Sequence, residues 1–452
     1  MIWRMVSRVL CVVLAASALL VRTALAHDDS GGGVSLLRDA EIESIIRGWA
    51  TPIWLAAGLD PEAVHIYIVN DPQLNSFVAG GQNLFMNSGT LMRSESPNQI
   101  IGIMAHETGH MAGGHLARSE EALRNATIQG IVAMVAGAAA AAAGSGQAAA
   151  AAVLAGQSMA ERSFFSFSIT QEASADQAAL TYLDRTHQSA RGLLQFFEIL
   201  QQEELLSGGH QDPYLRTHPL TSQRVDYVRE HVRTSKYSEA KDSPAALEMH
   251  QRLKAKLMAF LQPPSQVLGT LKPDDHSVAA RYARAIADYR TPDLGKAVPE
   301  IDALIRDYPN DPYFRELKGQ MLFENGRIAE AVAPYDEAVR LKPDNALLRV
   351  EAAQVQLETN NPALVAKARS NLVDAVRFED RNPDAWHFLA IAYGRSNNMG
   401  MMALSLAEQG MASGDYTQAR QQAARALKLL PPGLARQHAL DLQGEAKRES
   451  DR

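Results

Sequence analysis

The sequence predicts an α+β protein that is mainly helical, with a first domain that contains a small β-sheet and an all-α solenoid after it. Three observations lead to this fold class. The run Val64 to Val69 alternates and is β-branched, as a strand is, among longer stretches with apolar residues at helical spacing. The motif His106-Glu107-Thr108-Gly109-His110 lies within one of these helical stretches. After residue 276, small and apolar residues recur every 34 residues, which is typical of helical repeats.

The composition is that of a globular protein, with 46% hydrophobic and 21% charged residues, and 452 residues suffice for more than one domain. The formal net charge of -7 argues against nucleic-acid binding. A surface that follows phosphates needs clustered Lys and Arg, and the composition offers no such excess.

The N-terminus has the features of a secretory signal peptide. Two arginines precede an apolar run from Val9 to Val21, and Ala24-Leu25-Ala26 offers the small residues that a signal peptidase reads. We predict a signal peptide over residues 1–26; the alternative is a retained membrane anchor, for which the run is short. The only cysteine, Cys11, would be removed with it. A mature chain without cysteine has no disulfide, thiol nucleophile or cysteine zinc ligand.

The first elements expected in the mature chain are a helix, a strand and a hairpin. Leu36 to Leu59 carries apolar residues at helical spacing, and the strand over Val64–Val69 follows. Phe77–Ala79 and Leu84–Met86, separated by Gly80-Gly81, predict a hairpin whose outer member forms a sheet edge.

The helix that carries the histidine motif has its own start signal. Ser96 can cap the helix, Pro97 suits the first helical position, and Gln99 completes a capping box. This start places His106 and His110 well inside a helix, four residues apart and on one face.

An alanine-dominated segment over residues 126–158 is split by Gly144-Ser145-Gly146 and predicts a helical hairpin. Three roles stay open for it: close packing within the domain, docking on a membrane surface or membrane protein, and a true membrane span. The second arm has only Val153 and Leu154 of the residues that drive strong insertion, which disfavours the span.

The pattern divides the mature chain into a motif-bearing domain over residues 27–235, a junction over 236–275 and a repeat domain over 276–447. The 34-residue recurrence is typical of tetratricopeptide helix pairs, with a generic helical bundle as the alternative. We expect four units, with an insertion between Pro343 and Pro383. The matching positions are Ala285, Ala297, Ile301, Leu304 and Pro309, followed by Gly319, Ala331, Tyr335, Ala338 and Pro343.

Two histidines leave a catalytic zinc ion one protein ligand short. His115 is one candidate, but nine residues place it near the opposite face of a continuous helix from His106, so we interpret it as structural. Glu172, on a later helix, is the second candidate. Asp176 lies one turn further along and can accept a hydrogen bond from the outer nitrogen of a ligating histidine.

The motifs His106–His110, Glu172–Asp176 and Thr217-His218-Pro219, with Arg224, resemble those of the gluzincin peptidases related to the CAAX prenyl protease and HtpX. With the signal peptide and the C-terminal tetratricopeptide region, the resemblance points to periplasmic members of that family. It implies a gluzincin metalloprotease domain followed by a tetratricopeptide solenoid.

The resemblance also implies an activity and partners. It implies a zinc endopeptidase with one Zn²⁺ per chain, acting in the periplasm in quality control and assembly of outer-membrane proteins. Its substrates would be unfolded or misassembled outer-membrane proteins, and its repeats would bind the assembly machinery in a chaperone-like role. The alternative is a non-proteolytic tetratricopeptide scaffold that uses the protease fold for binding.

The residues then suggest individual roles. Zinc held by His106, His110 and Glu172 would lower the pKa of a bound water, whose proton Glu107 would take. Substrate would add as a strand along an edge formed by Leu84, Phe85 and Met86. For His218 three roles stay open: a hydrogen bond to the oxyanion, a latch whose imidazole takes the water position on the zinc, or a merely structural His-Pro turn.

Overall fold

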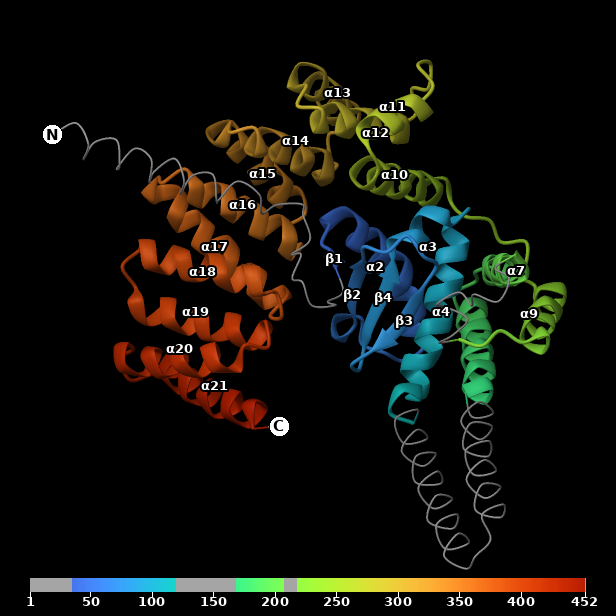
Figure 1. Ribbon diagram of the computed structural model, residues 1–452, viewed down its shortest axis with the longest axis horizontal. Coiled ribbons are helices and arrows are strands. Elements are labelled where there is room, and N and C mark those ends of the chain that lie inside the picture. Colours follow the sequence, from blue (N-terminus) through green and yellow to red (C-terminus); the bar gives the residue numbers. More distant parts are fainter. Residues whose placement is uncertain (1–34, 119–167, 207–217, 452) are drawn as a thin grey trace, which may run out of the picture. The chain divides into compact units, whose positions relative to one another are not determined.

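The computed structural model describes residues 35–118, 168–206 and 218–451, and the chain divides into two compact units (Figure 1). The first unit comprises residues 1–38 and 45–247, and the second comprises 39–44 and 248–452. The expected signal peptide (1–26) and alanine-rich hairpin (126–158) lie outside the described residues. Among the residues that are described, we find no helix with the length and hydropathy of a membrane span.

The first unit contains a four-stranded sheet in the order β1-β2-β4-β3. β2 is parallel to β4, and the other pairs are antiparallel. The predicted strand and hairpin are confirmed. The strands are β1 Leu36–Leu37, β2 His65–Val69, β3 Ser76–Ala79 and β4 Asn83–Asn87.

Two expectations about this sheet are wrong. Leu36 and Leu37 pair with β2 as a strand, and the helix expected from Leu36 begins only at Ala40. β4 lies inside the sheet with Leu84 and Met86 fully buried, so Leu84–Met86 is not an edge, and β3 is the outer strand of the hairpin. A hairpin does not itself reveal which strand faces outward, because the parallel pairing of β2 with β4 joins residues that are distant in sequence.

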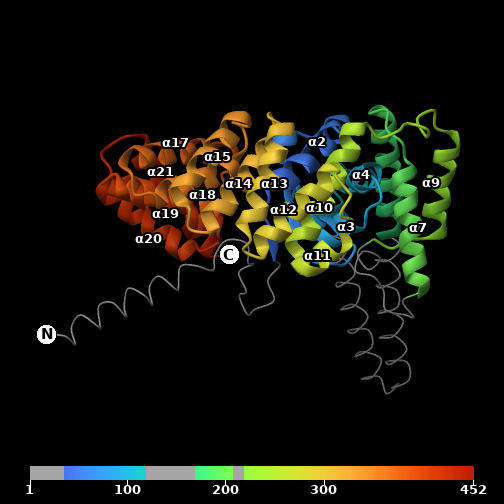
Figure 2. The ribbon, with the colours of Figure 1, turned by 90° about the horizontal axis from the view of Figure 1, so that it is seen from above.

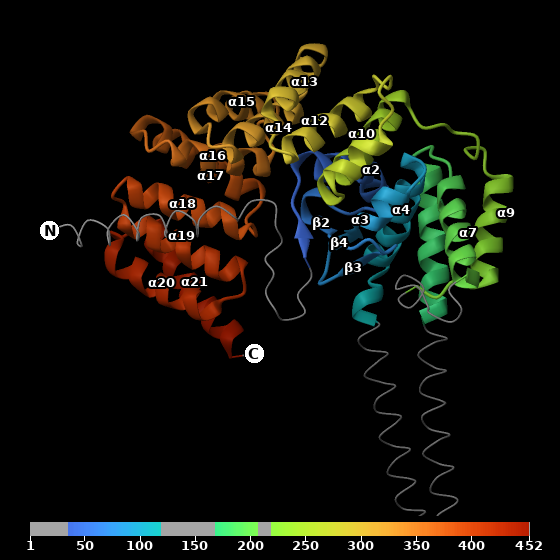
Figure 3. The same cartoon turned by 45° about the horizontal axis from the view of Figure 1, so that its top comes forward.

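Helix α4 lies between the sheet and a group of antiparallel helices (Figures 1 and 3). Two glycines allow α4 and α7 to touch through their backbones: a Cβ on Gly102 would lie 2.7 Å from the Leu193 nitrogen, and one on Gly192 would lie 2.3 Å from the carbonyl carbon of Asn98. The helices of this region are α2 Ala40–Ala56, α3 Ser88–Arg93, α4 Pro97–Gly113, the helix over 168–185, α7 Arg191–Leu206 and α9 Ser222–Thr234.

The second unit is helical, and its consecutive helices stack along the unit (Figure 2). α12 Val278–Arg290, α14 Pro312–Glu324 and α16 Ala346–Glu358 begin 34 residues apart, which is the predicted recurrence. The remaining bounds are α13 Leu294–Asp307, α15 Ile328–Leu341, α17 Pro362–Phe378, α18 Pro383–Arg395, α19 Met399–Ala412, α20 Tyr416–Leu429 and α21 Leu434–Ser450.

The repeat array differs from the expected four units. The extra residues predicted between Pro343 and Pro383 lengthen α17, which has 17 residues against 14 in α13 and α15. A further helix, α21, follows α20. This last helix buries only Ala439, Leu442 and Ala446, as suits a terminal helix with a polar outer face, so the repeat pattern did not reveal it.

The segment 236–275, expected as a junction, contains helices α10 Pro244–Leu261 and α11 Pro264–Thr270. Its composition concealed α10 because part of the buried face of this helix is charged. Within the second unit, the fully buried Lys256 Nζ lies 2.8 Å from Asp39 Oδ2, 3.3 Å from Glu41 Oε2 and 3.4 Å from Glu316 Oε2. Arg252 also contacts Glu41, and these charges therefore neutralise one another.

Candidate metal centre

Helix α4 begins and ends at defined caps. The Ser96 hydroxyl accepts a hydrogen bond from the Gln99 N–H at 3.3 Å, which confirms the predicted cap. The Gln99 side chain returns to the N–H of Glu95 at 2.8 Å rather than to that of Ser96. Gly114 ends the helix in the left-handed region, with φ 61°, and its N–H donates to the carbonyls of His110 and Met111.

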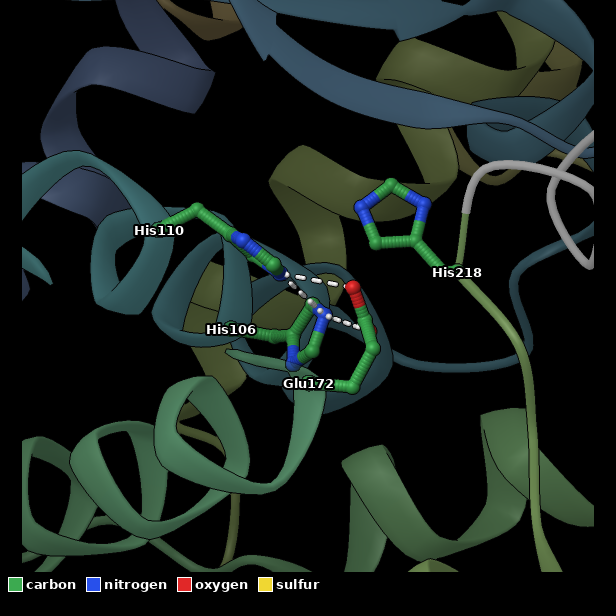
Figure 4. A group of neighbouring side chains, drawn as sticks. All are labelled: His106, His110, Glu172 and His218. Atoms are coloured by element: carbon green, nitrogen blue, oxygen red, sulfur yellow. Dashed lines mark hydrogen bonds and ion pairs between the residues drawn. The ribbon is translucent and has the colours of Figure 1, made fainter. Parts of the chain in front are cut away.

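Four buried side chains converge at the middle of α4: His106, His110, Glu172 and His218 (Figure 4). One ligand atom from each lies within 4.8 Å of the others. The Nε2 atoms of the two α4 histidines are 3.1 Å apart, and the Glu172 oxygens lie 3.3 Å from His106 Nε2 and 3.4 Å from His110 Nε2. Ligand atoms about 2.1 Å from a shared tetrahedral ion are separated by roughly 3.4 Å, so the spacing fits a metal site.

Glu107 lies beside this group with both carboxylate oxygens buried, and neither oxygen accepts a hydrogen bond from the described residues. Burial raises the pKa of Glu107 to about 8. A buried carboxylate without donors is costly unless another group provides them, so its position suits a side chain that exchanges a proton with a metal-bound group.

Asp176 and Arg224 surround the ligand group. Asp176 Oδ1 lies 2.9 Å from His106 Nδ1, as the sequence predicted for an orienting carboxylate. Arg224 holds both carboxylates: its Nε is 2.6 Å from Asp176 Oδ2, and its Nη1 is 2.9 Å from Glu172 Oε2. Burial acts to lower the pKa of His106, but hydrogen bonds to Asp176 and Glu172 outweigh it and raise that pKa to about 9.

His115 is outside the ligand group, yet it contacts a member of it. Its Nδ1 lies 3.1 Å from Nδ1 of His110, the nitrogen that faces away from Glu172, and the side chain is buried. The prediction missed this contact because it assumed a continuous helix, whereas the left-handed Gly114 redirects the chain. Gly113 provides the space for the His115 ring, since a Cβ at Gly113 would lie 2.4 Å from His115 Nε2. In the sequence, the Gly113-Gly114 pair was the available indication that the helix ends before His115.

Gly109 explains how a later helix reaches the histidines. A Cβ at Gly109 would lie 2.7 Å from the carbonyl oxygen of Ala175, so the glycine of the motif allows the helix over 168–185 to approach α4 through its backbone. This approach brings Glu172 and Asp176 to His106.

A pocket of about 360 Å³ lies beside His110. Its other walls come from the end of β3, the turn after it, the end of α4 and the residues that follow α4. Besides His110, the pocket is lined by Val78, Gly80, Gly81, Gln82, Met111, Gly114, Leu116 and Ala117. The pocket therefore joins the outer strand of the sheet to the ligand group.

Comparisons with known proteins agree with this geometry. Residues 36–232 match the model of peptidase family M48, and residues 279–346 match a tetratricopeptide repeat model. The chain is 23% identical over 373 residues to the beta-barrel assembly-enhancing protease of Yersinia pestis, covering 78% of this chain and 73% of that protein. For the protein of the same name in Escherichia coli (strain K12), it is 22% identical over 397 residues, covering 86% and 79%.

A shorter relative matches only the first part of the chain. Metalloprotease YcaL of Escherichia coli (strain K12) is 27% identical over 177 residues, which cover 39% of this chain and 64% of that protein. The predicted resemblance and fold class are confirmed. The chain thus carries a metallopeptidase domain of peptidase family M48 over residues 36–232, followed by tetratricopeptide repeats.

Proposed function

We propose that this protein is a zinc endopeptidase of the periplasm that degrades unfolded or misassembled outer-membrane proteins. The observation that carries the proposal is the buried group of ligand-type atoms within 4.8 Å of one another, with the carboxylate of Glu107 beside it, which accepts no hydrogen bond from the described residues. His106, His110 and Glu172 would hold the ion, a donor set that suits zinc in hydrolytic sites. The metalloprotease family and the names of the relatives support this proposal.

The residues of the site have separate roles in the proposed reaction. A bound Zn²⁺ would supply Lewis acidity at the substrate carbonyl and lower the pKa of a water. Glu107 accepts the proton at its carboxylate and returns it to the leaving amine. Asp176 fixes the tautomer of His106, and Arg224 holds Asp176 and Glu172 in place through ion pairs.

Substrate would bind as a strand added to β3, the outer strand, instead of the Leu84–Met86 segment first considered. The pocket between Val78 and His110 supports this placement, because a strand beside β3 would pass the ligand group. Main-chain hydrogen bonding gives affinity with little sequence selectivity, which suits a protease that removes misfolded proteins.

The repeats would recruit the outer-membrane assembly machinery and give the protein its chaperone-like role. The names of the relatives, which refer to assembly of beta-barrels, support this partner, and repeat solenoids commonly offer extended binding surfaces. Contact of residues 126–158 with a membrane surface stays a proposal.

Removal of the metal tests the proposed activity directly. We expect protein treated with a zinc chelator to lose degradation of a permanently unfolded protein, and stoichiometric Zn²⁺ to restore it, because only the loaded site activates water. The measurements are zinc content and loss of full-length substrate. Degradation by the stripped protein would contradict the proposal. Absence of cleavage in both states, with suppressed aggregation of an unfolded outer-membrane protein, would favour the scaffold alternative.

His218 is proposed as a latch. Its Nε2 is 3.8 Å from Glu107 Oε1, its ring centroid is 5.5 Å from that of His106 and 5.2 Å from that of His110, and burial lowers its pKa to about 3, which leaves a neutral imidazole. A neutral imidazole at this place can occupy the water position of the ion.

The substitution His218→Ala is expected to increase degradation of unfolded protein about tenfold, since a latch worth roughly 1.4 kcal/mol leaves about a tenth of the molecules open. His231→Ala, which alters a partly exposed histidine on α9, is the control. A fall of about 10²-fold or more would instead indicate an oxyanion donor. An unchanged rate would indicate a structural turn.

A further inference from the structure

A row of three aromatic rings crosses the sheet and ends at its outer strand. Phe85 on β4 stands opposite Tyr67 on β2 and Phe77 on β3. The ring centroids of Tyr67 and Phe85 are 4.9 Å apart with an interplanar angle of 17°, and those of Phe77 and Phe85 are 4.9 Å apart with an angle of 6°. The last ring of the stack belongs to β3.

The row lies on the less buried face of the sheet. Side chains alternate along a strand, and Ile66, Ile68, Leu84 and Met86 are buried on the opposite face. The three rings are only partly buried, and the proposed mechanism uses none of them. Because the three rings leave apolar surface exposed to solvent, packing of the core does not fully explain them, and a binding role is the alternative.

The hydrogen-bond register of β3 shows what an added strand would meet. The N–H of Asn87 donates to the carbonyl of Asn75 at 3.0 Å, so every second pair, including Phe77 with Phe85, is a hydrogen-bonded pair. The main chain of Val78 then points to the outer side of β3. Ser76 is fully buried, which limits the accessible part of the edge to Phe77–Ala79.

An antiparallel strand that hydrogen-bonds to Val78 would set one of its residues opposite Phe77 in a non-hydrogen-bonded pair, where side chains approach most closely. Adjacent strands are about 4.8 Å apart, close to the 4.9 Å spacing of the rings. An aromatic side chain at that position would become the next ring of the stack, while its neighbours in sequence would face the Val78 side, where the pocket beside His110 lies.

We propose that Phe77, backed by Phe85 and Tyr67, is a subsite for an aromatic side chain of an extended substrate. Along the substrate strand, this side chain lies an odd number of residues from the side chains that face His110. The inference rests on the proposed function, in which β3 takes up a substrate strand. Strands of outer-membrane barrels alternate and carry aromatic residues in girdles, so such clients offer the pattern that this subsite selects.

The test measures binding apart from cleavage. Zinc-loaded full-length Glu107→Gln protein is titrated with fluorescent peptides long enough to add one strand, in which a single Phe or Leu is moved one residue at a time. We expect Phe to bind about 2- to 10-fold more tightly than Leu at alternate positions only, the factor that ring stacking supplies. Phe77→Leu should remove this alternation and Phe77→Tyr should retain it.

Tyr227→Leu is the matched control, because Tyr227 is an exposed aromatic residue on α9. A Phe preference equal at every position, one unchanged in Phe77→Leu, or no binding of any peptide would overturn the inference. The same peptides are given to zinc-loaded wild-type protein. Cleavage without alternation sinks only the subsite, whereas alternation without cleavage sinks only the proposed peptidase activity.

Discussion

Glu107→Gln is expected to slow cleavage of an unfolded protein by about 10²- to 10⁴-fold while the protein keeps its zinc. The amide has nearly the shape of the carboxylate but does not accept the proton that Glu107 is proposed to move. The ligands His106, His110 and Glu172 are unchanged, so the metal content should stay at the wild-type level. Degradation is followed by loss of full-length substrate, and zinc by elemental analysis.

Glu198→Gln serves as the control for this substitution, because Glu198 forms a surface ion pair with Arg229 and lies outside the ligand group. It should degrade substrate at the wild-type rate. Equal degradation by Glu107→Gln and wild type, with zinc retained in both, would refute the role of Glu107. Loss of zinc together with activity would indicate a ligand or folding defect, and it would contradict the expected retention of the metal.

Glu41→Gln is expected to destabilise the second unit by about 3–5 kcal/mol at pH 7. Removing one charge from a buried network leaves the others uncompensated. Glu41 is 1% exposed, its Oε2 lies 3.3 Å from Lys256 Nζ, and it also accepts a hydrogen bond from the Tyr282 hydroxyl at 2.8 Å. The loss can be measured by hydrogen exchange of α10 and α14 in increasing urea, which reports this unit separately.

The pH dependence follows from the same contacts. Burial alone would raise the pKa of Glu41, but the charges of Arg252 and Lys256 outweigh it and lower that pKa below 4.5. A carboxyl whose pKa is lower in the folded state contributes stability above its pKa in the unfolded chain and loses it as pH falls through the folded-state pKa. The difference in the free energy of unfolding between Glu41→Gln and wild type should therefore be largest at pH 7 and become smaller below about pH 4.5.

Glu330→Gln is the matched substitution in the same unit. Glu330 on α15 forms an exposed ion pair with Arg327, which precedes that helix, and such pairs contribute little, so we expect the stability to stay at the wild-type level. Equal effects of the two substitutions would mean that the buried network around Lys256 does not hold residues 39–44 in the second unit.

Much of the candidate site was open to prediction because its signals are local. A cap at Ser96 and a spacing of four residues suffice to set His106 and His110 on one face of a helix. The same spacing relates Glu172 to Asp176, and the structure brings both to His106. The 34-residue recurrence predicted the repeats because each helix pair packs mainly on its neighbours.

Other features depended on contacts between distant residues. Sequence reasoning placed Leu84–Met86 at an edge, because a hairpin leaves open which strand joins the rest of the sheet. His115 lies outside the ligand group, but its contact with His110 was not predicted because a continuous helix was assumed. The boundary between the two units lies inside the segment 236–275, but α10 was not predicted there, because the Lys and Arg that this helix buries resemble solvent-facing residues until their partners are known.

The sequence by itself therefore determined the metal-binding motif, its helix and the repeat period, since these follow from periodicity and capping within a few residues. Only the tertiary structure decided which strand of the hairpin faces outward, that Arg224 joins Asp176 to Glu172, and that Lys256 lies among three carboxylates. The physical reason is that burial and charge neutralisation depend on contacts between segments far apart in sequence. No pattern within a few residues indicates which of these segments will meet.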